Sequence, residues 1–490
     1  MIRLFAVASV LGTIAAKLTV QSADLVIRNG SIYTIDRVST KAGALAVKNG
    51  IISFVGSNEG VAPYVGNETK VVDLHGRAAI PGLVDSHMHT LSGGLFLLKC
   101  DLNYQPLDLN AVLQHIQRCI DDETGKSDTD WVDVVNLDFP SLVTRSGSVG
   151  KVQLDKLNTS RPLSIRSSDY HTVLVNSRAL ELSDITASTP DPPNGKIERL
   201  PGSKEPSGVL QDQASGLLSG PPPPNEEQQV EAGRAALKAL RQAGITTFQE
   251  AAAGADAQKT YKTIQTEGGL SSRGWFDYRI EAPPSLDGVP KLVSNAAALI
   301  KSLNDNSTIG PAPALKWQAI KAFVDGVITY PANTAALIDP YWSPVNGTNE
   351  TVWRPDNSTL NKPYWSVEIL ARTLEGLFLQ GIDAQLHVDG DLAVRIGLDA
   401  AAAFKKKYPD RKFKLGLAHD ELSHQDDWAR FAELEVDPIM SFQWSQLSSF
   451  YIPSTFQSLA EYRKRNLQAY AQIEKAGRPI TYGSDWPVRR

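Results

Sequence analysis

Eight short apolar runs of strand length recur from residue 79 onward, and helix-like stretches separate most of them. The runs are residues 79–84, 245–250, 275–281, 317–324, 382–387, 414–419, 437–442 and 479–484. The helix-like stretches include residues 226–243, 367–380 and 391–407. Strands that alternate with helices predict a parallel sheet, and eight such units predict a closed α/β barrel, the (β/α)8 barrel of the TIM type.

Two other regions lie outside this alternation. Residues 24–78 hold short β-type runs broken by Asn29-Gly30 and Asn49-Gly50, and each pair predicts a hairpin because both turn positions favour positive φ. We expect a small, incomplete N-terminal β-sandwich module there. The gap after the first barrel strand is far longer than one helix, and it contains strand-like runs at 131–137 and 163–166.

The resulting organisation has five parts. They are a signal peptide (1–23), the small β module (24–78), the first barrel strand and its loop (79–99), an insertion domain (100–225) and the remainder of the barrel (226–490). The insertion ends in Pro221–Pro224, which is a stiff spacer.

The first 23 residues have the layout of a secretory signal peptide. A basic start at Arg3 precedes an apolar run from Leu4 to Ala16, which is too short for a membrane anchor, and small residues follow. A buried N-terminal strand or helix is the alternative. Seven N-x-[ST] motifs also predict a secreted glycoprotein, at Asn29, Asn67, Asn158, Asn306, Asn346, Asn349 and Asn357. Three of them fall within residues 346–359, where we expect an exposed loop.

Composition narrows the classes of partner. Lys and Arg total 49 against 54 Asp and Glu, a net charge of −5, so no basic surplus favours nucleic acid or an anionic membrane. The hydrophobic fraction of 42% is that of a globular chain. Cys100 and Cys119 allow at most one disulfide, which excludes a disulfide scaffold and a four-cysteine zinc module.

Side chains with metal-binding chemistry lie at five of the eight runs. Asp85–His89 closes the first, Lys321 lies in the fourth, His387 and His419 end the fifth and sixth, and Asp485 follows the eighth. Carboxyl ends of barrel strands share one face, so these groups should converge there. His-x-His on a strand points both imidazoles the same way. Each motif alone also occurs as a packing or turn feature, but the set indicates a site for Zn²⁺, with Mn²⁺, Fe²⁺ or Co²⁺ as alternatives.

As a set, these motifs resemble the metal-dependent amidohydrolase superfamily. The matching stretches are Pro81–His89, Lys321–Gly326, His387–Asp391, His419 and Gly483–Pro487. Within the superfamily the chain is most similar to the YtcJ-like (amidohydrolase 3) branch, which includes N-substituted formamide deformylases. The insertion contains further stretches that are similar to this branch, at residues 169–177, 194–195 and 206–210.

The resemblance implies a role for each site residue. His87 and His89, completed by Asp485, hold one metal ion, His387 and His419 hold a second, and carboxylated Lys321 bridges the two. Asp485 also takes and returns the proton of the attacking water, and His171 contacts the substrate or transition state, although a structural role for His171 is an equal alternative. The implied reaction is hydrolysis of a C–N bond in a small amide or formamide. Hydrolysis of cyclic amides, esters or lactones is the alternative within the enzymes, and a metal-free, inactive secreted binding protein is the alternative outside them.

Three features depart from the family pattern. Ala418 precedes His419 where the family has Glu, which leaves His424 as an alternative ligand. The fifth motif reads His387-Val-Asp-Gly where the family more often has Ala-Ile-Gly after the histidine. The chain also stops five residues after Asp485, before the last barrel helix and the strands that finish the β module. We therefore expect a truncated C-terminus, whose exposed apolar edges favour a homo-oligomer.

Overall fold

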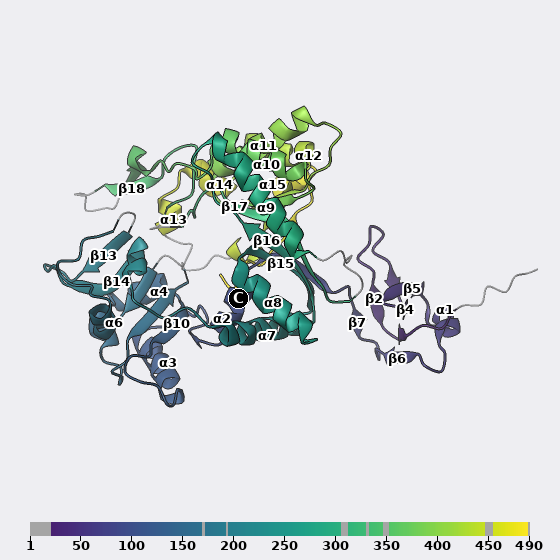
Figure 1. The fold of residues 1–490 in the computed structure, drawn as a ribbon, viewed down its shortest axis with the longest axis horizontal. Coiled ribbons are helices and arrows are strands. Elements are labelled where there is room, and N and C mark those ends of the chain that lie inside the picture. The colour runs from purple at the N-terminus through teal and green to yellow at the C-terminus, as the bar shows by residue number, and fades with distance from the viewer. Residues whose placement is uncertain are drawn as a thin grey trace, which may run out of the picture. The chain divides into compact units, whose positions relative to one another are not determined.

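The computed structural model describes residues 21–168, 172–192, 195–304, 312–329, 333–345, 352–445 and 454–488 (Figure 1). Backbone contacts divide the chain into two units, residues 1–82 with 310–312 and residues 83–309 with 313–490. The contact boundary falls at Gly82, and the finer boundaries expected at residues 78, 99 and 225 stay predictions. The proposed signal peptide, except for residues 21–23, lies outside the described residues.

The N-terminal unit contains two small sheets. The first has the strand order β5 (Ile51–Gly56), β4 (Ala44–Lys48), β1 (Leu25–Arg28) and β6 (Lys70–Asp73), and α1 (Asn58–Val61) packs on it. The second has the order β3 (Lys41–Ala42), β2 (Ser31–Tyr33) and β7 (Ala78–Ala79). The four-stranded sheet encloses a small core around Val26, Ala44 and Ala46.

One of the two predicted hairpins is present. Asn49 and Gly50, with φ values of 51° and 74°, connect the antiparallel strands β4 and β5. The hairpin predicted at Asn29-Gly30 is wrong, because β1 and β2 belong to different sheets. Strand β1 already pairs with β4 on one side and β6 on the other, so it has no free edge for β2.

The second unit contains the predicted eight-stranded parallel barrel sheet. Its strands, in spatial and sequence order, are β8 (Leu83–Met88), β15 (Ile245–Ala253), β16 (Arg273–Arg279), β17 (Leu315–Phe323), β20 (Asp383–Val388), β21 (Leu415–His419), β22 (Asp437–Met440) and β23 (Thr481–Tyr482). The first strand begins at Leu83, later than expected, because Ala78–Ala79 pairs with β2 in the other unit. Asp485 N donates to His87 O at 2.7 Å, so the segment after β23 returns to β8.

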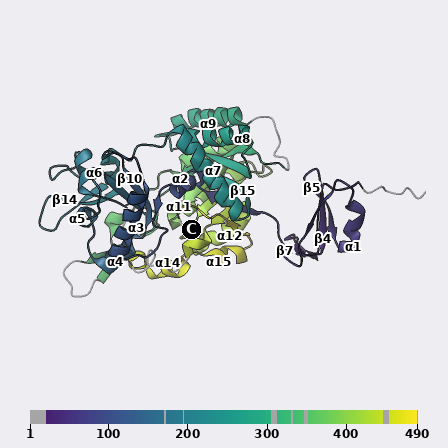
Figure 2. The same cartoon turned by 90° about the horizontal axis from the view of Figure 1, so that it is seen from below.

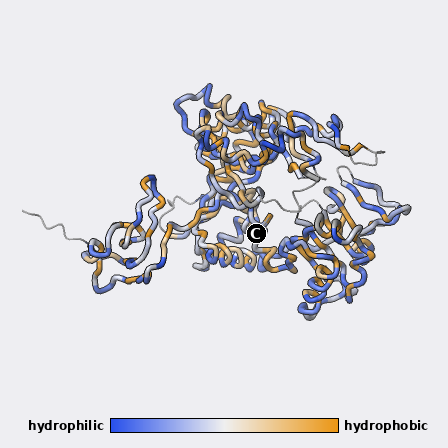
Figure 3. Tube along the Cα trace, turned by 180° about the vertical axis from the view of Figure 1, so that it is seen from behind, coloured by the Kyte–Doolittle hydropathy of each residue, from blue (hydrophilic) through white to orange (hydrophobic). Residues whose placement is uncertain are grey.

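Helices surround this sheet, as Figures 1 and 2 show. They are α2 (Thr90–Leu97), α7 (Glu226–Gln242), α8 (Ala255–Thr266), α9 (Val289–Leu303), α10 (Val367–Phe378), α11 (Asp391–Lys407), α12 (Trp428–Leu434), α14 (Glu461–Asn466) and α15 (Tyr470–Lys475). Helix α7 starts where Asn225 and Gln228 cap each other reciprocally. Hydrophobic and hydrophilic residues alternate along the helices (Figure 3), and the apolar positions pack on the strands. None of the helices within the described ranges has the length and apolar character needed to span a membrane.

The insertion forms a six-stranded sheet of its own. Its order is β13 (Gly195–Arg199), β14 (Pro206–Asp212), β12 (Thr172–Val175), β11 (Leu163–Ser167), β10 (Val132–Leu137) and β9 (Cys100–Asp101), with helices α3 (Leu109–Asp122), α4 (Phe139–Ser146), α5 (Lys151–Leu154) and α6 (Ser177–Leu182). Strands β10 and β11 are the two runs expected from the sequence. Separate apolar clusters on the sheet, one around Ile165 and one around Val173, stabilise this region.

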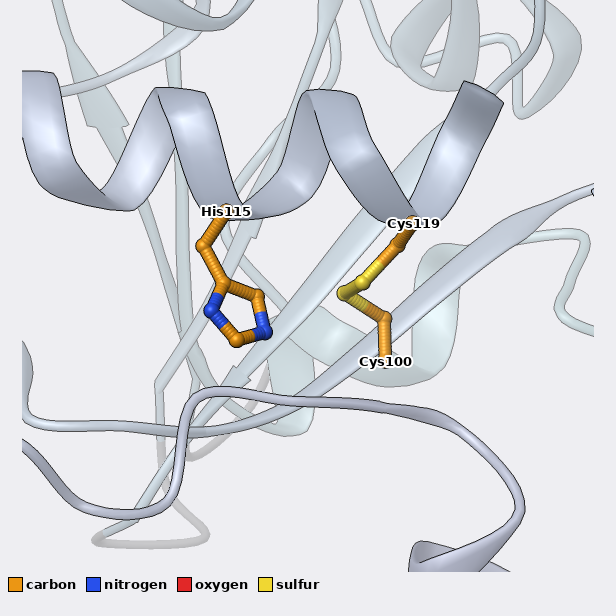
Figure 4. Close-up of side chains that lie close together, drawn as sticks. All are labelled: Cys100, His115 and Cys119. Atoms are coloured by element: carbon orange, nitrogen blue, oxygen red, sulfur yellow. A yellow bond between two sulfur atoms is a disulfide. The ribbon is translucent and has the colours of Figure 1, made fainter. Parts of the chain in front are cut away.

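A disulfide joins Cys100 on β9 to Cys119 on α3, with a Cα–Cα distance of 5.8 Å (Figure 4). His115 lies one turn before Cys119 on the same helix face. The three side chains are close enough to share a metal ion, but both sulfur atoms are already bonded to each other. The Cys100–Cys119 disulfide is therefore a covalent cross-link within the insertion.

The predicted loop at residues 346–359 is partly wrong. Residues 352–355 form β19 (Val352–Pro355), which pairs with β18 (Trp342–Val345), and a short 3-10 helix spans Asn357–Thr359. Asn306, Asn346 and Asn349 lie outside the described residues. The four described acceptor asparagines, Asn29, Asn67, Asn158 and Asn357, are exposed.

Candidate metal centre

Six predicted site residues meet at the carboxyl ends of the barrel strands. They are His87 on β8, His89 after it, Lys321 on β17, His387 on β20, His419 at the end of β21 and Asp485 after β23. All are buried except His89, which is partly exposed. Lys321 is completely buried, and its Nζ lies 3.4 Å from both ring nitrogens of His87.

The first and last strands bring His87, His89 and Asp485 together. Oδ1 of Asp485 lies 3.2 Å from Nε2 of His87 and 3.3 Å from Nε2 of His89. A side chain at Gly483 would place its Cβ 2.5 Å from the Cβ of His87, so this approach requires glycine. His89 N also donates to Trp486 O at 2.7 Å, which holds the segment on β8.

His387 and His419 form the other side of the site. Their ring centres are 4.6 Å apart, and the ring of His419 lies 4.7 Å from that of His87. One ligand atom each from His87, His419 and Asp485 lie within 4.8 Å of one another. Nδ1 of His419 is buried and has no hydrogen-bond partner.

An unusual backbone conformation turns His419 into the site. Leu417 packs outward against Gly397 of α11, so the two-residue period of a strand would also point His419 outward. The φ of His419 is 79°, a left-handed value that a non-glycine residue rarely adopts. The ring instead stacks on Trp444 at 4.7 Å and 13° and faces the other imidazoles. Strand β21 can therefore direct His419 into the site, although Ala418 precedes it where the family has Glu.

Hydrogen bonds fix which ring nitrogens carry protons. Gln385 donates from Nε2 to Ser86 O at 3.0 Å, so its carbonyl Oε1 faces Nδ1 of His87, and that nitrogen must donate. Nε2 of His87 then presents a lone pair to Asp485. Nε2 of His387 donates to Gly326 O at 2.8 Å, which leaves its Nδ1 unprotonated.

Electrostatics gives His87, His387 and Asp485 the protonation states of metal ligands. Burial, and secondarily Lys321, lowers the pKa of His87 to about 4 and that of His387 to about 3. Burial raises the pKa of Asp485, but the neighbouring imidazoles of His87 and His89 outweigh it and hold that pKa well below its ordinary value. A lone pair of neutral His87 therefore faces an ionised carboxylate. This arrangement is unfavourable unless a cation lies between them, so the residues fit a divalent metal.

The structure distinguishes His419 from His424 as the histidine that the sixth barrel strand contributes to the site. His424 caps a 3-10 helix, where its Nδ1 accepts from Asp426 N at 3.3 Å, and it belongs to neither group of metal-ligating side chains found among the described residues. His419, and not His424, is thus the sixth-strand histidine of the site. His171 lies outside the described residues, so its assignment stays a prediction, as do the individual roles of the six clustered residues.

Sequence reasoning missed three supporting residues. Gln385 orients His87, the carbonyl of Gly326 orients His387, and Trp444 supports His419. Gln385 precedes His387 by two positions, and this spacing places both side chains inside the barrel. Gly326 ends the matching stretch Lys321–Gly326, but that stretch does not single out its carbonyl, and no sequence signal marks Trp444, which lies after a strand.

A barrel that gathers four imidazoles, a buried lysine and a carboxylate at the carboxyl ends of its strands defines a metal-dependent hydrolase. The chain belongs to the Amidohydrolase family, whose sequence profile matches residues 70–490. It is accordingly a hydrolase of the class that acts on C–N bonds, and the resemblance noted from its motifs is confirmed.

Sequence similarity to curated proteins extends over most of the chain. It is 26% identical over 481 residues to Protein LONG AFTER FAR-RED 3 of Arabidopsis thaliana (95% of this chain, 76% of the relative). It is 27% identical over 407 residues to the putative amidohydrolase YtcJ of Bacillus subtilis (81% and 67%). It is 24% identical over 478 residues to the N-substituted formamide deformylase of Arthrobacter pascens (95% and 81%).

The fold is shared with solved structures. An uncharacterised metal-dependent hydrolase from Pyrococcus horikoshii superimposes with a TM-score of 0.67 at 20% identity, covering 95% of this chain and 83% of that one. This similarity supports the barrel architecture expected from the eight apolar runs.

Proposed function

We propose that this protein is a secreted hydrolase that cleaves the C–N bond of an N-substituted formamide or a related small amide, using two divalent metal ions. The observation that carries the proposal is the cluster of His87, His419 and Asp485, whose ligand atoms lie within 4.8 Å of one another in a buried site. Similarity to the formamide deformylase over 95% of the chain supports the substrate class.

The site residues would hold two ions. His87, His89 and Asp485 would hold one, His387 and His419 would hold the other, and Lys321 would serve both as an anionic carbamate ligand. Imidazole and carboxylate ligands suit zinc. Burial lowers the pKa of Lys321 to about 8, which favours the neutral amine that reacts with CO2. The reaction replaces a cation, which would repel the metal ions, with an anion that attracts them.

When bound, the ions polarise the scissile carbonyl and lower the pKa of the attacking water. Asp485 accepts the proton of that water, because it is ionised and its neighbours His87 and His89 hold it in place. The same carboxyl group then returns the proton to the departing amine nitrogen. Gln385 and the carbonyl of Gly326 keep the histidine tautomers fixed throughout.

Metal analysis combined with hydrolysis assays tests this function. We expect about two equivalents of zinc or a similar ion per chain and release of formate from N-substituted formamides. Removal of the metal with a chelator should abolish turnover, and returning it with bicarbonate should restore turnover. Asp485→Asn should lower kcat by about a thousandfold or more. His424→Asn is the matched control and should be neutral, since His424 lies outside the cluster. A metal-free chain, or full activity in Asp485→Asn, contradicts the proposal.

Secretion and glycosylation rest on separate observations. The Cys100–Cys119 disulfide supports folding in an oxidising compartment, and the four described acceptor asparagines are exposed. Expression in a eukaryotic host should yield protein in the medium that lacks about the first 23 residues. Its mass should fall after treatment with an N-glycosidase. Retention inside the cell with an intact N-terminus contradicts this part of the proposal.

A further inference from the structure

A permanent positive charge lies at the carboxyl end of β16. The eight described barrel strands carry two cationic residues at their carboxyl ends, Lys321 on β17 and Arg279 on β16, and the two are paired in register. Lys321 is completely buried, whereas the side chain of Arg279 is 55% exposed. Arginine does not lose its proton in proteins, so β16 ends in a solvent-accessible cation.

The side chain of Arg279 belongs to the inner face of the barrel. Trp275 and Asp277 precede it by four and two positions on β16, and both line a cavity inside the barrel. The two-residue period of a strand therefore directs Arg279 inward as well, nearer the mouth. There its guanidinium carbon lies 5.0 Å from the ring centre of Phe323.

The guanidinium lies within reach of a substrate at the metal centre. The ring centre of Phe323 is 4.9 Å from that of His387, so the guanidinium carbon of Arg279 is at most about 10 Å from the His387 ring. An extended chain advances about 3.8 Å over three bonds, and a charge-assisted hydrogen bond adds about 2.8 Å. A group two or three carbons beyond a scissile amide can therefore reach Arg279.

The barrel wall beside Arg279 holds no predicted metal ligand. The six ligands come from β8, β17, β20, β21 and the segment after β23, whereas β15 and β16 lie between β8 and β17 and supply none. A substrate at the metal centre can extend along this part of the wall without displacing a ligand. Strand β15 ends in Ala251–Ala253 and β16 ends in Arg279, so Arg279 supplies the charge that such a substrate meets.

The guanidinium keeps N–H groups available for another anion. Its Nε and Nη2 atoms each lie 2.7 Å from Oε1 of Glu281, and its Nη1 atom has no hydrogen-bond partner among the described residues. Glu281 is itself 68% exposed, and exposed ion pairs of this kind stabilise only weakly. A carboxylate can therefore bind the outer edge of the guanidinium, through Nη1 and Nη2.

We propose that Arg279 determines specificity by binding a carboxylate that the substrate carries two or three carbons beyond its scissile amide. This inference rests on the proposed function and narrows its substrate class to N-formyl amino acids and related small amides that bear a carboxylate. The planar guanidinium matches the two oxygens of a carboxylate, and its single positive charge balances the single negative charge.

A matched pair of substrates tests the inference. 3-Formamidopropanoate carries a carboxylate where 3-formamidopropanamide carries a neutral amide group of nearly the same shape. The wild-type kcat/KM for formate release should favour the carboxylate by about tenfold or more, mainly through KM. Arg279→Gln should lower kcat/KM for the carboxylate by about 10- to 100-fold, leave that for 3-formamidopropanamide within about threefold, and retain the metal. Arg279→Lys should keep part of the preference, because lysine retains the charge and loses the planar fork.

Arg273→Gln is the control variant. Arg273 begins β16, six positions and about 20 Å from Arg279 along the strand, at the opposite end of the barrel. The substrate preference should be unchanged in this variant. Equal wild-type rates for both compounds, or equal losses for both in Arg279→Gln, overturn the inference. A loss of metal in Arg279→Gln also overturns it and gives Arg279 a structural role.

The hydrolytic function and the carboxylate site can fail separately. Cleavage of both compounds at equal rates retains the proposed function and overturns the inference. If neither compound is cleaved, the hydrolytic proposal fails for them, and calorimetry with the metal-loaded protein then decides the role of Arg279. Binding of 3-formamidopropanoate that is at least about tenfold tighter than that of 3-formamidopropanamide, and lost in Arg279→Gln, supports the carboxylate site. Equal affinities overturn it.

Discussion

The side-chain carbonyl of Gln385 on β20 accepts a hydrogen bond from Nδ1 of His87 on β8, across the interior of the barrel. The same amide donates to the backbone at Ser86, which fixes its orientation. Two strands that are distant in sequence thus cooperate to direct one lone pair of His87 toward Asp485. A residue that binds no metal itself controls how a metal ligand is presented.

Replacing Gln385 with Ala should therefore weaken metal binding. Without the acceptor, His87 can protonate either ring nitrogen and rotate, so we expect affinity for the ion to fall about 10- to 100-fold. Competition with a chromogenic chelator measures the change. Gln318→Ala is the control, because Gln318 lies on the neighbouring strand and donates to Asp383 instead of a site histidine. Equal affinities for the Gln385 variant and the wild type would contradict this role.

The indole of Trp444 should matter for a similar reason. It stacks on His419, whose φ of 79° is strained and needs support from its surroundings. Trp444→Ala should lower metal affinity by about two- to tenfold, the range of a lost aromatic contact, and Trp444→Phe should retain most of it. Metal titration of both variants checks this. A phenylalanine variant as weak as the alanine variant would argue against stacking.

The barrel could be predicted because its signal is local and repeated. Each strand is a short apolar run, and the polar residue at its carboxyl end lies on the shared face wherever the run ends. His87, His387 and Asp485 were found in this way, and an error of a few residues in a strand boundary did not move them to another face.

Other features depended on distant contacts. The Asn29-Gly30 pair has the local chemistry of a hairpin, but β1 was already paired on both sides, and pairing partners cannot be read from a dipeptide. His419 and His424 could not be separated by sequence, because the choice depends on a left-handed backbone and on the stack with Trp444.

A buried acid below the metal centre should make stability depend on pH. Burial raises the pKa of Asp277 on β16 to about 7, although Gln249 donates to both of its oxygens at 3.0 and 2.8 Å. Between the ordinary pKa of an aspartate, about 4, and this value, the folded protein binds more protons than the unfolded chain. The contribution of Asp277 to stability is therefore present below about pH 4 and is lost as the pH rises toward 7.

Asp277→Asn removes this ionisation while keeping the shape of the side chain. The variant should be more stable than the wild type at pH 8, by on the order of 4 kcal/mol, and nearly equal to it at pH 4. Urea unfolding at the two pH values measures the difference. A gain of the same size at both values would show that packing, and not ionisation, is responsible.

The disulfide should stabilise the insertion without taking part in the chemistry. Cys100 and Cys119 are 19 positions apart, and closing a loop of this length stabilises a fold by about 3 kcal/mol, chiefly by restricting the unfolded chain. The double variant Cys100→Ser/Cys119→Ser should lose about that much in the free energy of unfolding, and proteases should cut the insertion first. Its metal content should stay that of the wild type, because neither cysteine belongs to the cluster of His87, His419 and Asp485. Wild-type protein treated with a reductant is the matched control and should behave like the variant. If the double variant loses metal as well as stability, the disulfide also supports the loop before Cys100. The stability of the insertion and metal binding at the site would then be coupled.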